Sequence, residues 1–383
     1  MKSQRPADSD TITLSAVGDL AIHGQYDDLI TKHDPCFFFD NVSGFLKKSD
    51  IVFGNLESVL SGSGTSDLIK PLHLRGNPLY IEGLKYAGFN VLSLANNHSF
   101  DFGIEAYYEM KKALEFNGIN VVGGGEDISD SRRPLMIERR GISILFLAYS
   151  DESTGGFNEA HDNRPGVAPL DIEFIKEDIR KNRELVNCMV VSLHWGEEFN
   201  HYPSPKQVTY ARAIIDSGAD IILGHHSHVL QGIERYKSGV IAYNLGSMMM
   251  SGPSGRYEYI LQDNNRESAI LSCEISKNGV AGITITPVWL NDELCPVICE
   301  DGRRDEIMET VDNLSSEIIK EDYPEFWRDM VIRNKVKAPV KEWFARGNYL
   351  KRVKNLRPGD IKRPINLIVS YVRILLQNHL NIK

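Results

Sequence analysis

The stretch Ile221-Ile222-Leu223-Gly224-His225-His226-Ser227-His228-Val229 places three imidazoles directly after a short apolar run. Such runs, rich in β-branched residues and bounded by glycine, predict buried strands. The 383-residue chain has eleven histidines, and three of them at the end of one predicted strand indicate an assembled site rather than scattered surface residues. We therefore expect a strand that ends at the histidines and delivers them to that site.

Similar apolar runs recur on the N-terminal side of this stretch, each ending in a polar or glycine-rich cluster. They cover residues 12–17, 51–53, 91–94, 120–122, 142–148 and 189–193. Helical patterns separate several of them, at residues 104–116, 172–185 and 205–216. The alternation of strands and helices predicts an α/β fold. After residue 228 the pattern changes to strands with few helices, at residues 232–236, 240–243, 257–261, 268–275 and 283–288, which we interpret as antiparallel sheet.

The composition fits one large globular domain with an extension. Hydrophobic residues make up 42% of the chain and charged residues 25%, as in ordinary soluble domains. We expect a disordered N-terminus over residues 1–10, one domain over residues 11–300, and a helical, basic C-terminal extension over residues 301–383.

Charge is distributed unevenly along the chain. The formal net charge is −9, whereas residues 351–383 hold eight Lys or Arg residues and one acid. The acidic balance of the remainder argues against a nucleic-acid partner, which needs a basic face. Residues 365–380 show the pattern of an amphipathic helix. In one interpretation this helix packs on the protein itself or on another subunit, and in the other it makes peripheral contact with a membrane.

The five cysteines predict free thiols rather than a disulfide framework. Their number is odd and they form no CxxC pair, which favours a reducing compartment. The first ten residues are polar and contain no apolar segment of the signal-peptide type. We therefore expect a cytoplasmic protein, peripheral to a membrane if the basic tail docks there.

Five clusters of polar side chains follow the predicted strands, and the carboxyl ends of parallel strands converge in an α/β sheet. They contain Asp19 and His23; Asn55 and Glu57; Asn97, His98 and Asp101; His194; and His225, His226 and His228. Carboxylate oxygens and imidazole nitrogens are ligands of zinc, manganese and iron. No cysteine accompanies them, so they predict a catalytic or exchangeable metal site rather than a structural one.

Taken alone, each of these residues also has a structural interpretation. Asp19 could cap a helix, His98 could be a hydrogen-bonded core histidine, and Asp101 could cap the helix expected from residue 104. We expect Trp195 to pack in the core. Five such coincidences at strand ends are improbable together, so we favour the metal site and leave the role of Asp101 open.

With these motifs the sequence resembles a known family, the CapA or PgsA family of poly-gamma-glutamate capsule synthesis, within the calcineurin-like metallophosphoesterase superfamily. The resemblance rests on six short motifs between residues 11 and 250. They are Gly18-Asp19, Gly54-Asn55-Leu56-Glu57, Ala95-Asn96-Asn97-His98, His194-Trp195-Gly196, Gly224-His225-His226-Ser227-His228-Val229 and Tyr243-Asn244-Leu245-Gly246. Each motif alone is weak, but six of them in this order are specific.

The resemblance implies a four-layer α/β/β/α sandwich of mixed sheets with two divalent ions at the strand ends, manganese, zinc or iron. The implied metal ligands are Asp19, Glu57, Asn97, His194, His226 and His228. Asn97 binds the second ion or holds substrate, and His98 donates a proton to the leaving group. In a two-metal hydrolase the ions polarise the scissile bond and lower the pKa of bound water.

Some positions depart from the superfamily pattern. Its Asp-x-His motif is absent because His23 lies four residues after Asp19, and its bridging Gly-Asp-x-x-Asp appears as Gly-Asn-x-Glu. Strand alternation places His226 and His228 on one side, so we choose that pair as ligands. His225 is kept, with Asn55 and His23, as a substrate-binding candidate.

Two functions follow from the resemblance. In the first, the protein hydrolyses a phosphoester, or an amide of a polyglutamate or cell-envelope polymer. In the second, it is a non-catalytic accessory subunit of poly-gamma-glutamate or capsule synthesis or export, and its site is structural or binds an anionic polymer. Loops at residues 61–70 and 150–165 are expected to select the substrate, and their sequence carries no readable code.

Overall fold

The computed structural model describes residues 10–66, 70, 72–156, 158–251 and 265–334. By its internal contacts the chain divides into two units, Met1–Ile319 and Lys320–Lys383. The second unit contains α9 (Tyr323–Ile332). The expected disordered N-terminus, apart from residue 10, the strand at residues 257–261 and the helix at residues 365–380 lie outside the described residues. None of the described helices combines the length and apolar character that crossing a membrane requires.

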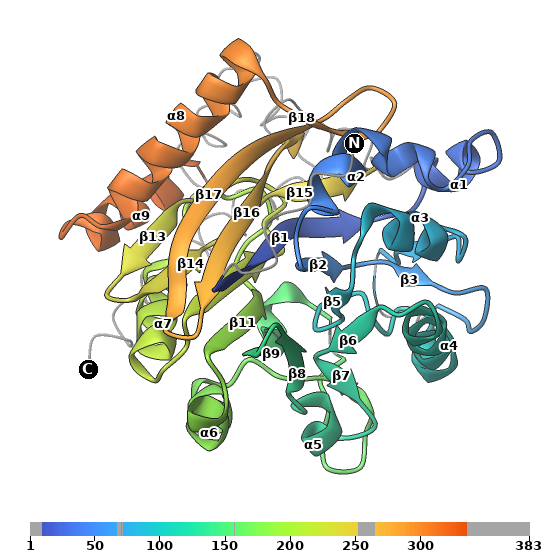
Figure 1. Cartoon of the computed structure of the whole chain (residues 1–383), viewed down its shortest axis with the longest axis horizontal. Helices are drawn as coiled ribbons and strands as arrows, with labels where there is room; N and C mark the ends of the chain where they lie inside the picture. Colours follow the sequence, from blue (N-terminus) through green and yellow to red (C-terminus); the bar gives the residue numbers. More distant parts are fainter. Residues whose placement is uncertain (1–9, 67–69, 71, 157, 252–264, 335–383) are drawn as a thin grey trace, which may run out of the picture. The chain divides into compact units, whose positions relative to one another are not determined.

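Two mixed sheets form the centre of the first unit (Figure 1). The larger sheet has the order β18-β17-β16-β1-β2-β5-β6, with β15 also paired to β1. Its strands are β1 (Thr11–Ala21), β2 (Ile51–Leu56), β5 (Val91–Ser93), β6 (Asn120–Val122), β15 (Ser247–Met250), β16 (Glu267–Ser276), β17 (Gly279–Leu290) and β18 (Pro296–Ile298). The smaller sheet has the order β13-β14-β12-β11-β9-β8. Its strands are β8 (Leu135–Arg139), β9 (Ile142–Ser150), β11 (Cys188–His194), β12 (Ile221–His225), β13 (Ile233–Tyr236) and β14 (Gly239–Ala242).

Helices and short elements complete the first unit. The helices are α1 (Gln25–Leu29), α2 (Asp40–Leu46), α3 (Tyr80–Ala87), α4 (Gly103–Phe116), α5 (Ile128–Ser131), α6 (Ile172–Asn182), α7 (Pro205–Asp216) and α8 (Asp301–Ile318), with 3-10 turns η1 (Phe37–Phe39), η2 (Glu152–Thr154) and η3 (Arg183–Leu185). Two small two-stranded sheets pair β3 (Val59–Leu60) with β4 (Arg75–Gly76) and β7 (Gly124–Gly125) with β10 (Gly166–Val167). The expected helix at residues 205–216 is confirmed, and it begins with a capping box between Ser204 and Gln207.

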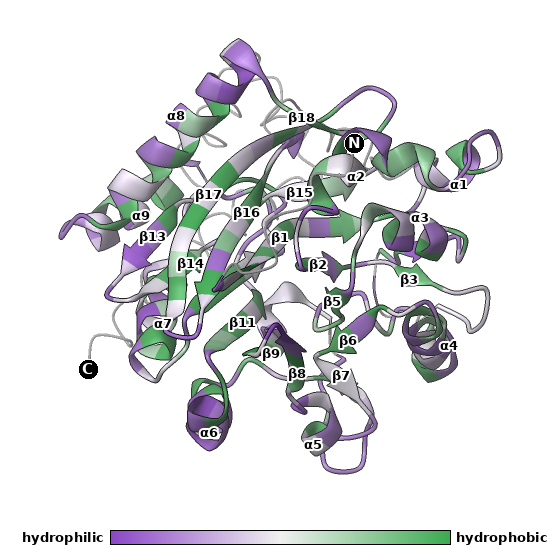
Figure 2. Ribbon diagram, viewed as in Figure 1, coloured by the Kyte–Doolittle hydropathy of each residue, from purple (hydrophilic) through white to green (hydrophobic). Residues whose placement is uncertain are grey.

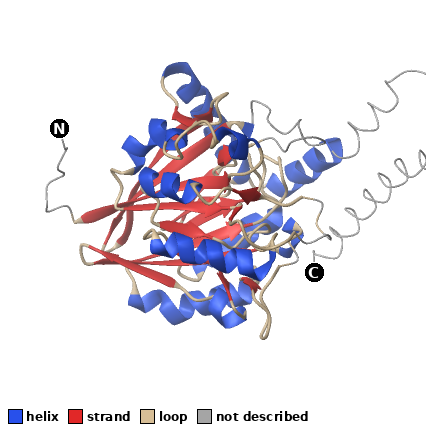
Figure 3. Cartoon of the chain, turned by 90° about the vertical axis from the view of Figure 1, so that its right-hand side faces the viewer, coloured by secondary structure: helices blue, strands red, loops and turns tan. Residues whose placement is uncertain are grey.

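The core arranges these elements in four layers, with helices outside two facing sheets (Figure 3). Between the sheets, Phe53 of β2 stacks on Phe146 of β9 at 5.7 Å between ring centroids. On the other face of the larger sheet, Leu84 of α3 and Met110 of α4 pack in a second cluster. The strands at the centre of the two sheets are buried on both faces, and this burial explains why their sequences are continuous apolar runs (Figure 2). The α/β/β/α sandwich that the resemblance implies is confirmed.

The expectation of antiparallel pairing after residue 228 is only partly correct. β16, β17 and β18 are antiparallel neighbours, but β14 runs parallel to β12 and β15 parallel to β1. The reason is that β13 and β14 form a hairpin whose second strand returns to the edge of β12 in the same direction. The strand period shows that a segment is extended, but it does not show which neighbour the segment joins.

Residues 243–246 cross close to strands of both sheets. A Cβ atom on Gly224, in β12, would lie 1.8 Å from the carbonyl oxygen of Tyr243, and one on Gly18, in β1, would lie 1.8 Å from that of Gly246. Only glycine allows such a close approach of two backbones. Each of these glycines directly precedes a site residue. Gly18 precedes Asp19 in β1, and Gly224 precedes His225 in β12.

Candidate metal centre

Asp19 lies near the end of β1, where the strand's pairing with β15 shifts register. Its carboxylate is fully buried and accepts two hydrogen bonds, from Asn55 Nδ2 at 2.8 Å and from the backbone N–H of His226 at 3.0 Å. A register shift re-aims a side chain at a strand end. Because Asp19 is a strand residue, the alternative that it caps a helix is wrong.

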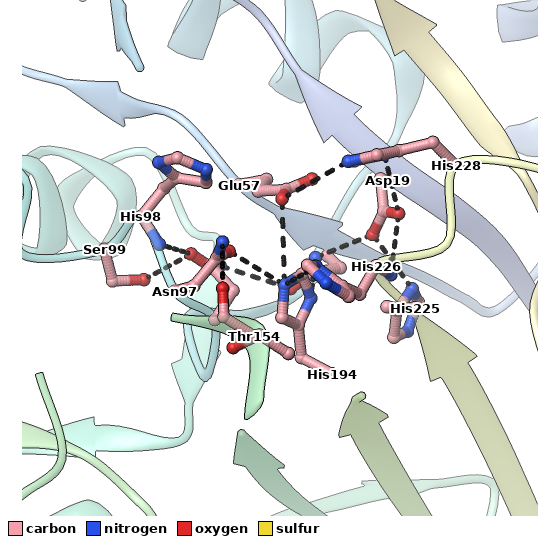
Figure 4. Close-up of polar contacts among 12 residues, drawn as sticks. Asp19, Glu57, Asn97, His98, Ser99, Thr154, His194, His225, His226 and His228 are labelled. Atoms are coloured by element: carbon pink, nitrogen blue, oxygen red, sulfur yellow. Dashed lines mark hydrogen bonds and ion pairs between the residues drawn. The ribbon is translucent and has the colours of Figure 1, made fainter. Parts of the chain in front are cut away.

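Glu57 follows β2 and places a carboxylate in the centre. Its side chain is buried, and neither carboxylate oxygen has a hydrogen-bond partner within the described residues. Oε1 lies 3.7 Å from Nε2 of His194 and 3.8 Å from Nε2 of His228 (Figure 4). A buried carboxylate without partners is costly, so this position suits a residue that binds a cation.

His194 is the last residue of β11, and its imidazole lies close to two other candidate metal ligands. Its Nε2 lies 2.9 Å from Oδ1 of Asn97 and 3.1 Å from Nδ1 of His226. Its other ring nitrogen, Nδ1, lies 3.2 Å from Nδ2 of Asn55, and the Nδ2 of Asn97 donates to the carbonyl of Thr154. The two amides thus orient the imidazole of His194, as the polar neighbours of metal ligands commonly do.

Of the three histidines, only His225 belongs to β12, which ends there. The backbone turns left-handed at His226 (φ 93°) and His228 (φ 58°), so these two do not continue the strand. Strand alternation was therefore the wrong reason to pair His226 with His228, although both lie in the centre (Figure 4). Left-handed non-glycine residues cost roughly 1–3 kcal/mol each and concentrate at functional sites.

The ring nitrogens of His228 and His225 have different surroundings. Nδ1 of His228 lies 3.0 Å from Oγ of Ser247 and 3.4 Å from Oδ2 of Asp19. His225 is completely buried, with Nδ1 3.4 Å from Oδ1 of Asp19, and neither of its nitrogens has a hydrogen-bond partner in the described part of the chain. Its substrate-binding role stays a prediction.

His98 sits at the edge of the centre in a three-residue network. Its Nδ1 lies 2.6 Å from Oδ2 of Asp101, and Nζ of Lys70 lies 2.5 Å from the other oxygen of that carboxylate. The same Asp101 accepts from the backbone N–H of Leu74 at 2.8 Å. No side chain caps α4, which begins at Gly103. The alternative that Asp101 caps this helix is therefore wrong, because its carboxylate is occupied elsewhere.

Burial and neighbouring charges together set the pKa values of the centre. Burial raises the pKa of Glu57 to about 8 and lowers the pKa of His226 to about 3. Burial also opposes the charged form of His228, but the carboxylates of Glu57 and Asp19 raise its pKa to about 9. For Asp19, burial opposes the charged form, but the neighbouring imidazoles of His225 and His228 overcome it and hold the pKa well below the usual range. Burial thus favours the neutral form of Glu57, whereas a bound cation would favour its charged form.

Three overlapping groups of donor atoms have the spacing that a metal ion needs, each within 4.8 Å. They are Asp19, Glu57 and His228; Glu57, His194 and His226; and Glu198, His226 and His228. The first two groups share Glu57, whose oxygens accept no hydrogen bond from the part of the chain that the structure describes. The donors are oxygen and nitrogen without sulfur, which suits zinc, manganese or iron. The residues present therefore fit a divalent metal centre.

Other residues singled out in the sequence lie outside these groups. His23 is buried, and its pKa is lowered by burial to about 4. Trp195 is buried and donates to the carbonyl of Tyr243 at 3.3 Å, as a packing residue does. Lys70 and Thr154 lie in the segments expected to select the substrate, residues 61–70 and 150–165, but no pattern singled out either residue. Glu198, four residues after His194, was not predicted either.

Comparisons with known proteins identify relatives of this chain. Residues 13–251 match the family described as "Bacterial capsule synthesis protein PGA_cap". The "PGA biosynthesis protein CapA" of Bacillus subtilis is 32% identical over 286 residues, which cover 74% of this chain and 73% of the relative. The "Capsule biosynthesis protein CapA" of Bacillus anthracis is 30% identical over 292 residues, covering 74% and 69%.

More distant matches were also found. The "Probable polyglutamine synthesis accessory protein Rv0574c" of Mycobacterium tuberculosis is 30% identical over 214 residues, covering 52% of this chain and 56% of the relative. A solved "Putative 5'-Nucleotidase" from Staphylococcus aureus is 12% identical, covers 79% of this chain and 58% of that chain, and has a TM-score of 0.47. The family match at residues 13–251 includes every residue of the three donor groups.

Proposed function

This chain belongs to the PGA_cap family of bacterial capsule synthesis proteins, and on that premise we propose that it is a metal-dependent hydrolase of this family. Its substrate is a phosphoester, or an amide of a polyglutamate or cell-envelope polymer. The observation that carries this proposal is Glu57, a buried carboxylate that has no hydrogen-bond partner among the described residues and that belongs to two groups of donors.

The two groups that share Glu57 define the proposed ligands. Asp19, Glu57 and His228 hold one divalent ion, and Glu57, His194 and His226, with Asn97 beside His194, hold a second. When bound, such ions supply Lewis-acid polarisation of the substrate and activation of water. Asn55 keeps the Asp19 carboxylate oriented through its 2.8 Å hydrogen bond.

His98 has the position of a proton donor beside this centre. Asp101 engages its Nδ1, which leaves Nε2 to face a leaving group. Lys70 and the backbone N–H of Leu74 hold the Asp101 carboxylate in place. The carboxylate in turn stabilises an imidazolium, although burial lowers the pKa of His98. General-acid help of this kind contributes roughly 10²–10⁴-fold to a rate.

A second candidate is the non-catalytic accessory role in polymer synthesis or export. The name of the mycobacterial relative, a probable accessory protein, favours it. In this role the same centre binds an anionic polymer without cleaving it. The basic residues 351–383 supply a peripheral membrane contact in either role, and co-sedimentation with anionic vesicles, compared with a chain ending at residue 348, tests that contact.

The two candidates separate in a turnover assay on the purified full chain. We expect activity on a panel of phosphoesters and γ-glutamyl oligomers, its loss with chelator, and its return with Mn²⁺ or Zn²⁺. His98→Asn should lose turnover while retaining metal, and His33→Asn, at a partly exposed histidine outside the loops expected to select the substrate, is the matched control. No turnover of any substrate by the metal-loaded protein would reject the hydrolase and leave the accessory role.

A further inference from the structure

Glu198 lies in the loop between β11 and α7 and is exposed. One oxygen of its carboxylate forms a group, within 4.8 Å, with ring nitrogens of His226 and His228. These two histidines belong to different proposed ion positions. Within the described residues, no hydrogen bond or ion pair engages this carboxylate. A free carboxylate therefore faces both imidazoles from the solvent side.

The loop that carries Glu198 is fixed against the histidine segment. The backbone N–H of Phe199 donates to the carbonyl of Ser227 at 2.8 Å, and Nε2 of Gln231 donates to the carbonyl of Asn200 at 2.7 Å. The Phe199 ring lies 5.9 Å from that of His228. These contacts place Glu198 beside the histidines through its backbone, so its position does not depend on a flexible side chain alone.

Phe199 has the third left-handed non-glycine backbone of this region, with φ 59°. His226 and His228 are the other two. A phenylalanine in this conformation is strained, and strain persists where the surrounding contacts enforce it. The turn at Phe199 sets the direction in which the preceding residue, Glu198, leaves the loop. Phe199, His226 and His228 are three of the seven left-handed non-glycine residues in the described part of the chain, and these three lie in the loop and the segment that face each other.

The two proposed ion positions differ in their number of protein donors. The group of Asp19, Glu57 and His228 has three protein donors, whereas the group of Glu57, His194 and His226 gains a fourth from Asn97. Carboxylate oxygen is a suitable fourth donor for manganese or zinc. We propose that Glu198 is an additional carboxylate ligand of the metal centre, supplied from the solvent side to the ion that His228 holds. This inference rests on the proposed metal centre.

Mn²⁺ binding to the full chain tests the assignment. Metal-free protein is titrated with Mn²⁺ by calorimetry and by electron paramagnetic resonance, for the wild type, Glu198→Gln and Glu197→Gln. Glu197 is an exposed neighbour whose carboxylate accepts from Asn200 Nδ2 at 3.3 Å, and a glutamine can keep that bond. We expect Glu198→Gln to weaken one Mn²⁺ site by at least about tenfold and Glu197→Gln to bind as the wild type does.

The outcomes separate this inference from the function on which it rests. If the wild type binds Mn²⁺ and Glu198→Gln binds it equally well, Glu198 is not a ligand and the metal centre stands. Equal weakening by both variants indicates a general charge effect and also overturns the assignment. If the wild type binds no Mn²⁺ at all, both the assignment and the proposed metal centre fail. Melting of the metal-free variants at the wild-type temperature excludes misfolding as the cause.

Discussion

Replacing Gly18 by alanine should destabilise the protein and displace Asp19. The added Cβ would lie 1.8 Å from the carbonyl oxygen of Gly246 and 2.8 Å from its carbonyl carbon. Ordinary contact begins near 3.4 Å, so the two backbones must separate by well over an ångström. The obstacle is backbone on both sides, which no rotamer change can relieve.

The expected magnitude follows from that geometry. Overpacking in a close-packed interior costs about 1–3 kcal/mol. The separation also breaks the hydrogen bond from the Asp19 N–H to the Gly246 carbonyl, at 3.0 Å, which is worth about 1 kcal/mol. We therefore expect the free energy of unfolding to fall by about 2–4 kcal/mol, and Mn²⁺ binding to weaken because Asp19 moves.

Urea unfolding of the metal-free protein measures this loss, with Gly44→Ala as the matched control. Gly44 is exposed in α2, and a Cβ there would meet nothing within 4 Å. Alanine in a helix is favoured over glycine, so the control should gain roughly 0.5–1 kcal/mol. A Gly18→Ala protein with wild-type stability and Mn²⁺ affinity would refute the reasoning, because the close approach would then carry no energy.

Three further predictions concern the metal centre and its surroundings. His228→Ala should lower the metal content found by elemental analysis, because two donor groups lose an imidazole, whereas His161→Ala should not; equal contents would contradict the ligand assignment. Chelation should lower the melting temperature, since an ion present at 100 times its dissociation constant stabilises by about 2.7 kcal/mol; an unchanged melting curve would show that no ion is bound. Burial lowers the pKa of His23 from 6.5 to about 4, so its folded form resists protonation. The stability this residue contributes is fully present above pH 6.5 and is lost as the pH falls towards 4, by about 2 kcal/mol at pH 5. In urea unfolding of metal-free protein between pH 7 and pH 5, His23→Gln should flatten this dependence, and an unchanged slope would count against it.

Much of the fold followed from local pattern. Residues 120–122 and 205–216 have the predicted limits, because a pair of β-branched valines and a capping box with proline mark them locally. β15 was missed because Ser247-Met248-Met249-Met250 contains no β-branched residue, so its composition does not favour a strand. The parallel pairing of β14 was also missed, since a strand's partner depends on the path of the whole chain.

Site residues at the ends of strands could be predicted from the sequence, whereas those in polar loops could not. Asp19 and His194 could be found because they lie at the ends of apolar runs. Lys70 reaches Asp101 from a polar loop, and such a loop gives no periodic signal. Asp101 has the spacing of a cap for the helix that follows it. Its actual partners, Lys70 and the backbone N–H of Leu74, are distant in sequence, so the local pattern could not reveal them. Left-handed backbone at His226 and His228, and not strand alternation, brings these two side chains into the centre.

The crossing of residues 243–246 has a consequence for recombining members of this family. The tetrapeptide lies against Gly18 in one sheet and Gly224 in the other, so its path sets the distance between strands encoded far apart. A chimera that takes residues 1–130 from one parent and the remainder from another would combine a Gly18 and a tetrapeptide that have not evolved together. Successful crossovers should therefore keep both glycines and the tetrapeptide from a single parent, whatever the origin of the surface loops.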